Sequence, residues 1–272
     1  MQEMSVVWLR AAAALYAVGL VHAFSVMLFR STRWYRYALP AFRAGILFHL
    51  VALVELGVAL RHLPADNFYE TSSLCGFLIA LLYLFVTRQY QFESLSLIFF
   101  PLVFLMTLIG AMELPVGSWS SPRVRDAWLL AHVLTVLVGY AGLLLTAAGS
   151  VFYLIQERRL KTKRSLALFE KLPPLGTLDK LISYSMAFGF VFITLALIAG
   201  TTWAYVEIGT RWIGEPKIVV SLATWFFCLV MVYLRVSAGW RGRKAAVMAI
   251  TVLGFSALTW AAHVGLRPLI AP

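Results

Sequence analysis

Long apolar runs alternate with short polar connectors along almost the whole chain. A helix needs about 20 apolar residues to cross a hydrocarbon core of roughly 30 Å, and it satisfies its own backbone hydrogen bonds there. The pattern therefore predicts an all-α polytopic membrane protein with about eight transmembrane helices. The predicted helices cover residues 5–29, 42–62, 71–87, 94–112, 127–155, 182–207, 217–235 and 245–266.

The composition fits a chain that lies mainly in lipid. Of the 272 residues, 61% are hydrophobic and only 13% are charged, and the mean hydropathy is +0.85. Ordinary soluble domains contain far more charge and far less apolar surface. Because the connectors are too short for a separate soluble domain, we expect a single transmembrane domain over residues 1–272.

Lysine and arginine are unevenly distributed among the connectors. Sixteen of the 23 basic residues lie in the first, third, fifth and seventh connectors. Basic residues gather in cytoplasmic loops, so these connectors are predicted to be cytoplasmic and both termini to lie outside. Orientation and contact with anionic membrane lipid then account for the net charge of +11, and no nucleic acid partner is needed.

The longest cytoplasmic connector covers residues 156–180. Its basic start and its ALFEKL stretch predict a helix at the membrane interface that ends before Pro173 and Pro174. A charged hinge and a regulatory contact with a soluble protein are both compatible with this segment.

The cysteines exclude two kinds of chemistry. Cys75 and Cys228 stand alone inside predicted spans, and the chain has no C-x-x-C or C-x-x-C-H sequence. Thiol exchange and covalent haem attachment to this chain are therefore not expected.

Ionisable side chains inside a membrane are costly, so each intramembrane histidine is a functional candidate. His132 and His263 fall near the predicted outer face, and His62 lies at the outer end of the second helix. His22 and His49 share a deeper level nearer the cytoplasm. Two imidazoles at one depth can ligate haem iron from opposite sides, but a histidine that hydrogen-bonds to a neighbouring helix gives the same pattern.

The outer connector GTTWAYVEIGTRWIGEPK, residues 200–217, combines aromatic residues, charges and glycines. Trp203 and Trp212 offer stacking surfaces for a porphyrin, and Arg211 and Lys217 offer cations for its propionates. The alternative is an interfacial aromatic belt, which membrane proteins commonly carry at this depth.

This connector resembles the tryptophan-rich signature of the CcsA and CcmC cytochrome c assembly family, which reads G-x-x-W-A and then W-G-x-x-W-x-W-D-P-K-E. The matching positions here are Gly200, Trp203, Ala204, Ile208, Gly209, Trp212, Gly214, Glu215, Pro216, Lys217 and Ile218. RHLPADNFYET at 61–71 is similar to the family's R-H-F-P-x-x-N-x-Y-E-S, and HVLTVLVGYAGLL at 132–144 is similar to its H-V-x-x-x-x-x-x-Y-A-x-L helix.

The resemblance implies that His132 is an external axial ligand of non-covalent haem b. The second metal ligand would be His263, which falls several residues before the family position, or else His62. The family's Y-L-H-x-R histidine is replaced by Arg235 in YLRVS, and together with the eight-helix size this departure resembles the HemX-like branch.

The function implied is haem handling for cytochrome c assembly in a bacterial plasma membrane. The protein would present or export haem at the outer face, beside a ResB/CcsB-like membrane partner and apocytochrome c, without acid or base chemistry of its own. The alternatives are a HemX-like regulator of tetrapyrrole synthesis that acts through its cytoplasmic loop, and a small-solute transporter. The transporter is disfavoured because the sequence has no clear inverted repeat.

Overall fold

The computed structural model describes residues 2–65, 67–90, 95–112, 119–162 and 173–264, and these residues form helices and connectors without a β-strand. The predicted all-α class is therefore confirmed for the described residues. The chain divides into two compact units, residues 1–116 and 117–272, each of which is described by itself below.

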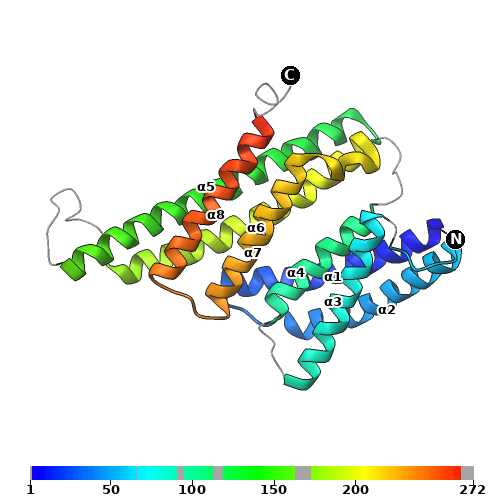
Figure 1. Ribbon diagram of the computed structural model, residues 1–272, viewed down its shortest axis with the longest axis horizontal. Helices are drawn as coiled ribbons and strands as arrows, with labels where there is room; N and C mark the ends of the chain where they lie inside the picture. Colours follow the sequence, from blue (N-terminus) through cyan, green and yellow to red (C-terminus); the bar gives the residue numbers. More distant parts are fainter. Residues whose placement is uncertain (1, 66, 91–94, 113–118, 163–172, 265–272) are drawn as a thin grey trace. The chain divides into compact units, whose positions relative to one another are not determined.

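The described residues of the first unit form four helices, coloured blue to blue-green in Figure 1. They are α1 (Gln2–Phe29), α2 (Tyr35–Leu60), α3 (Phe68–Tyr90) and α4 (Ser96–Gly110). Helix α1 packs against α2 and α4, and α3 packs against α4. Aromatic rings fill the centre, where Phe42 stacks on Phe100 with ring centroids 4.5 Å apart and Tyr83 meets both rings edge-on.

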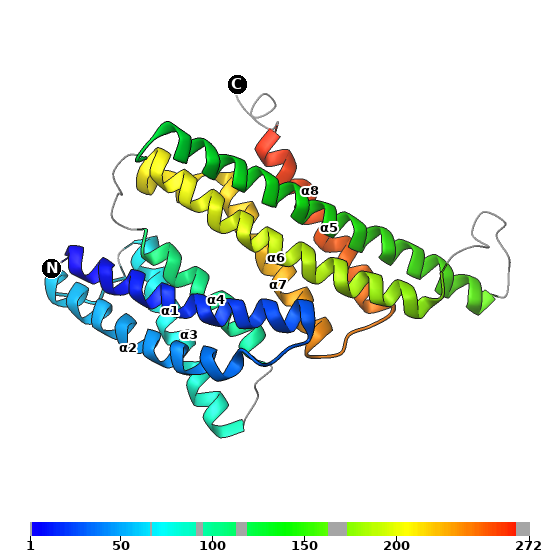
Figure 2. The same cartoon turned by 180° about the vertical axis from the view of Figure 1, so that it is seen from behind.

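The second unit contains the remaining elements, α5 (Pro122–Thr162), α6 (Leu175–Ile208), the 3₁₀ helix η3 (Gly209–Gly214), α7 (Pro216–Val236) and α8 (Arg243–Val264). Figures 1 and 2 both show α5 and α6 side by side along most of their length. Glycines permit this approach, because a Cβ on Gly142 would lie 2.8 Å from the Cα of Gly189. Small residues at helix contacts are typical of membrane bundles.

Six of these helices are long and apolar enough to cross a membrane: α1, α2, α3, α5, α6 and α7. The chain is therefore a multi-pass membrane protein. Helix α4 is shorter, at 15 residues, and α8 is not among the six within the described part of the chain. The count of eight spans and the outer location of both termini thus stay predictions.

The connector predicted to be cytoplasmic differs from the prediction at its start. Residues 156–162 do not begin a separate interfacial helix but continue α5, because its polar end still forms helical side-chain pairs. Glu157 and Lys161 are one turn apart and form an ion pair with 2.7 Å between Oε1 and Nζ. Helix α6 starts directly after Pro174, and residues 163–172, which include the whole ALFEKL stretch, lie outside the described residues.

The RHLPADNFYET segment acts as a helix start. The Asn67 side chain accepts a hydrogen bond from the backbone N–H of Glu70 at 2.9 Å, and its amide donates to the Glu70 carboxylate at 2.9 Å. An asparagine before a helix with an acid three residues later forms a reciprocal cap of this kind. The asparagine and glutamate of this motif therefore have a structural role at the start of α3.

Candidate functional site

A cavity of about 390 Å³ lies between α5, α6 and α7 in the second unit. Most of its wall is aliphatic. The polar groups along it belong to His132, Tyr140, Thr201, Trp203, Ser221 and Thr224. Both its volume and its apolar wall with a few polar groups are typical of small-molecule sites.

His132 is held in a defined orientation at this cavity. Its Nδ1 lies 2.9 Å from the backbone carbonyl oxygen of Ala196 on α6. A carbonyl oxygen only accepts hydrogen bonds, so Nδ1 carries the proton and, in the neutral ring, Nε2 carries the lone pair. This is the tautomer in which a histidine ligates a metal through Nε2 while its other nitrogen is oriented by a backbone carbonyl.

Gly200 lies against the imidazole of His132. A Cβ at this position would lie 2.5 Å from Cε1 and 2.7 Å from Nδ1 of that ring. A glycine lets the backbone come close to a neighbouring group because it has no side chain. At Gly200 the close neighbour is the histidine, and any larger residue would displace the ring.

The two tryptophans of the connector have different environments. Trp203 lies at the end of α6 and lines the cavity, and among the described residues its buried Nε1 has no hydrogen-bond partner. Trp212 in η3 is wholly buried and is not among the cavity-lining residues. Trp203 therefore borders the cavity, whereas Trp212 packs inside the protein.

A cluster that sequence reasoning missed lies where α5 begins and α6 ends. Trp119 Nε1 donates to the Glu207 carboxylate at 2.9 Å, and the Arg125 guanidinium forms an ion pair with the same carboxylate. The Arg125 guanidinium carbon lies 5.9 Å from the centroid of the Trp203 ring. The available signal was the WSSPRVRDAW segment at 119–128, an aromatic and charged stretch that the predicted topology places on the same face as residues 200–217.

Four other predicted site residues are not among the described residues that line the cavity. Arg211 is exposed, and the side chains of Lys217 and His263 lie outside the described residues. His62 is exposed in the first unit, where its Nδ1 lies 3.1 Å from the carbonyl oxygen of Leu63. The second axial ligand therefore stays a prediction.

His22 and His49 are buried in the first unit and each contacts a hydroxyl on a neighbouring helix. His49 Nε2 lies 2.9 Å from Ser73 Oγ, and its Nδ1 lies 3.5 Å from the Tyr16 hydroxyl. His22 Nε2 lies 3.3 Å from Ser96 Oγ. These contacts match the hydrogen-bonding interpretation, and no group of three or more His, Cys, Asp or Glu side chains suited to a metal occurs among the described residues.

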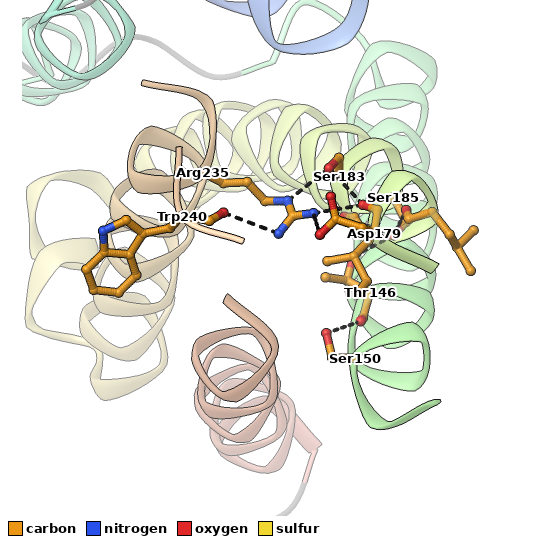
Figure 3. Close-up of polar contacts among 9 residues, drawn as sticks. Thr146, Ser150, Asp179, Ser183, Ser185, Arg235 and Trp240 are labelled. Atoms are coloured by element: carbon orange, nitrogen blue, oxygen red, sulfur yellow. Dashed lines mark hydrogen bonds and ion pairs between the residues drawn. The ribbon is translucent and has the colours of Figure 1, made fainter. Parts of the chain in front are cut away.

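Arg235 is buried at the C-terminal end of α7 (Figure 3). Its guanidinium donates to the Asp179 carboxylate and backbone carbonyl, each at 2.7 Å, and to Ser183 Oγ at 2.9 Å. A longer contact of 3.4 Å reaches the carbonyl oxygen of Trp240. The position where the resembled family carries a histidine is thus filled by an ion pair that joins α6 to α7 and to the turn before α8.

Comparison with known proteins agrees with the motif resemblance. The sequence model of the family described as cytochrome C assembly protein matches residues 65–263, well over half of the chain. The chain belongs to this family. The match begins just before α3, so it leaves out the helices that carry His22 and His49.

Among curated relatives, the cytochrome c biogenesis protein CcsA of Prochlorococcus marinus strain MIT 9215 is 30% identical over 213 residues, which cover 70% of this chain and 69% of that protein. The CcsA proteins of Welwitschia mirabilis and Heterosigma akashiwo strain NIES-293 / 8280G21-1 are 26% and 24% identical. The Welwitschia alignment covers 77% of this chain and 76% of that relative. The Heterosigma alignment covers 75% of this chain and 73% of that relative. No solved structure matches the chain.

Proposed function

We propose that the protein binds haem b non-covalently at the outer face of a bacterial plasma membrane and presents or exports it for cytochrome c assembly. The family membership supports the assembly role. The observation that carries the proposal is the pairing of His132 Nδ1 with the Ala196 carbonyl beside a cavity of about 390 Å³.

The residues along the cavity fit a planar, iron-containing ligand. His132 would ligate the iron through Nε2, since Nδ1 is engaged by a carbonyl oxygen. Trp203 would pack against the ring and offer its buried indole N–H, which requires an acceptor. A second axial ligand from His263 or His62 remains part of the proposal, as do contacts from Trp212, Arg211 and Lys217.

This chain's contribution is positional. Haem supplies the vinyl groups to which the cysteine thiols of an apocytochrome add. His132 and Trp203 would hold the ligand at a fixed place and orientation, and the aliphatic wall of the cavity would exclude water. No side chain at the cavity needs to act as an acid or base.

The proposed partners follow from this role. Apocytochrome c and a ResB/CcsB-like membrane protein would meet the predicted outer face, beside the tryptophan-rich connector whose Trp203 lines the cavity. Anionic lipid would contact the basic cytoplasmic connectors.

The test combines genetics with spectroscopy. Deleting the gene should abolish haem-stained c-type cytochromes, and the detergent-purified wild type should show a Soret band after haem titration. Normal c-type cytochromes in the deletion strain, together with a protein that takes up no haem, would contradict the proposal.

A further inference from the structure

The carboxylate of Glu207, in the last turn of α6, is surrounded by donors from α5 and its preceding segment. It accepts hydrogen bonds from Nε of Arg125, from the second guanidinium nitrogen of Arg125 at 3.4 Å, and from Nε1 of Trp119 at 2.9 Å. The ion pair thus joins the beginning of α5 to the end of α6.

This ion pair lies next to the His132 cavity. The Arg125 guanidinium carbon is 5.9 Å from the ring centroid of Trp203, within the range of a cation–π contact. The Trp203 ring itself lines the cavity together with His132. One indole therefore borders both the cavity and the cation.

The Arg125–Glu207 contact is partly exposed at the surface of the second unit. The side chains are 43% and 24% exposed, respectively. Ion pairs that water reaches contribute little net stability, so a second carboxylate can replace the first at small cost. A guanidinium has a planar set of donors suited to a carboxylate. Two of the Arg125 nitrogens are directed to Glu207, and the third lies 3.8 Å from the exposed Asp126 carboxylate.

We propose that Glu207 competes with a carboxylate of the bound ligand for Arg125, so that this ion pair selects ligands that carry carboxylates at the edge of the His132 cavity. This inference rests on the proposed function. In the free protein Glu207 holds Arg125 near Trp203, and on binding the ligand's carboxylate takes over the guanidinium. The site would then favour a dicarboxylate porphyrin over its uncharged ester.

The test compares haem with haem dimethyl ester, whose carboxylates are blocked. Dissociation constants are measured by Soret titration for the wild type and for Glu207→Gln, Arg125→Ala, Arg125→Lys and Arg123→Ala. Glutamine retains an oxygen for Trp119 but removes the competing charge. Arg123 is an exposed arginine two residues from Arg125 and serves as the matched control.

Glu207→Gln should tighten haem binding by about two- to five-fold, because this is the change in affinity that corresponds to the small free energy of an exposed ion pair. Arg125→Ala should weaken it by about ten-fold, and Arg125→Lys should fall between, because lysine keeps the charge but loses the planar fork. The ester's affinity should respond to none of these changes, and Arg123→Ala should behave as the wild type.

Two results would contradict the proposed competition for Arg125 but leave the proposed function standing. One is unchanged or weaker haem binding in Glu207→Gln while the Soret band still depends on His132. The ion pair would then only hold α5 and α6 together. The other is an equal response of haem and its ester. Absence of haem binding in the wild type would overturn the proposed function as well, so the two failures are distinguishable.

Discussion

The Nδ1 nitrogen of His132 on α5 lies 2.9 Å from the backbone carbonyl oxygen of Ala196 on α6. This contact fixes both the rotation of the imidazole and the position of its proton. Gly200 follows Ala196 by one helical turn and leaves room for the ring. One face of α6 therefore both orients the histidine and accommodates it.

Gly200→Ala should weaken haem binding while the protein stays folded. The new methyl group would lie 2.5 Å from Cε1 of His132, so the ring must move away from the Ala196 carbonyl. Loss of an orienting partner of a metal-bound histidine typically costs about 10–100-fold in metal affinity. Soret titration of the purified variant measures the change.

Gly254→Ala is the control for this change, since a Cβ at position 254 of α8 meets nothing within 4 Å. It should bind haem as the wild type does. Equal affinities in the two glycine variants would show that the close packing on His132 has no part in binding.

Arg235→Ala should lower the thermal stability of the detergent-purified protein strongly. The arginine side chain is 3% exposed, and its removal leaves the partly buried Asp179 carboxylate without its partner cation. Removal of one partner of a buried ion pair lowers the free energy of unfolding by about 3–5 kcal/mol. Unfolding followed by tryptophan fluorescence on heating reports the loss.

Lys161→Ala removes the cation of the exposed Glu157–Lys161 pair and should change stability by no more than about 0.5 kcal/mol. If both variants melt at the wild-type temperature, the Arg235–Asp179 contact has no role in holding α6 and α7 together.

Orientation is tested by chemical labelling in intact cells. A Ser120→Cys variant, at the exposed start of the second unit, should react with a membrane-impermeant thiol reagent from outside, whereas Thr162→Cys at the end of α5 should not. The wild type gives the background from Cys75 and Cys228. External labelling of Thr162→Cys would reverse the predicted topology.

The sequence predicted the helices well where apolar runs end sharply and less well where helical pairing continues beyond them. The run at 94–112 corresponds to α4 (Ser96–Gly110). The run at 127–155 is shorter at both ends than α5, which begins at Pro122 and continues to Thr162 through the Glu157–Lys161 pair. Hydropathy reports the lipid-facing length of a helix, whereas its ends depend on caps and polar pairs.

The candidate site was predictable only in part. His132 and Trp203 stand out because polar and aromatic groups at this depth are costly or specialised. The carbonyl oxygen of Ala196 leaves no trace in the sequence, since every residue carries one. Arg125 and Glu207 are 82 positions apart, and only the pairing of α5 with α6 brings them together.

The central claim is that His132 ligates haem iron, and a spectrum of His132→Ala tests it most directly. The variant should be produced at the wild-type level and should lose or shift the Soret band, because one histidine contributes little to the stability of the packed helices. Added imidazole should restore part of the band by occupying the vacated coordination position. An unaltered haem spectrum in His132→Ala at normal expression would contradict the assignment.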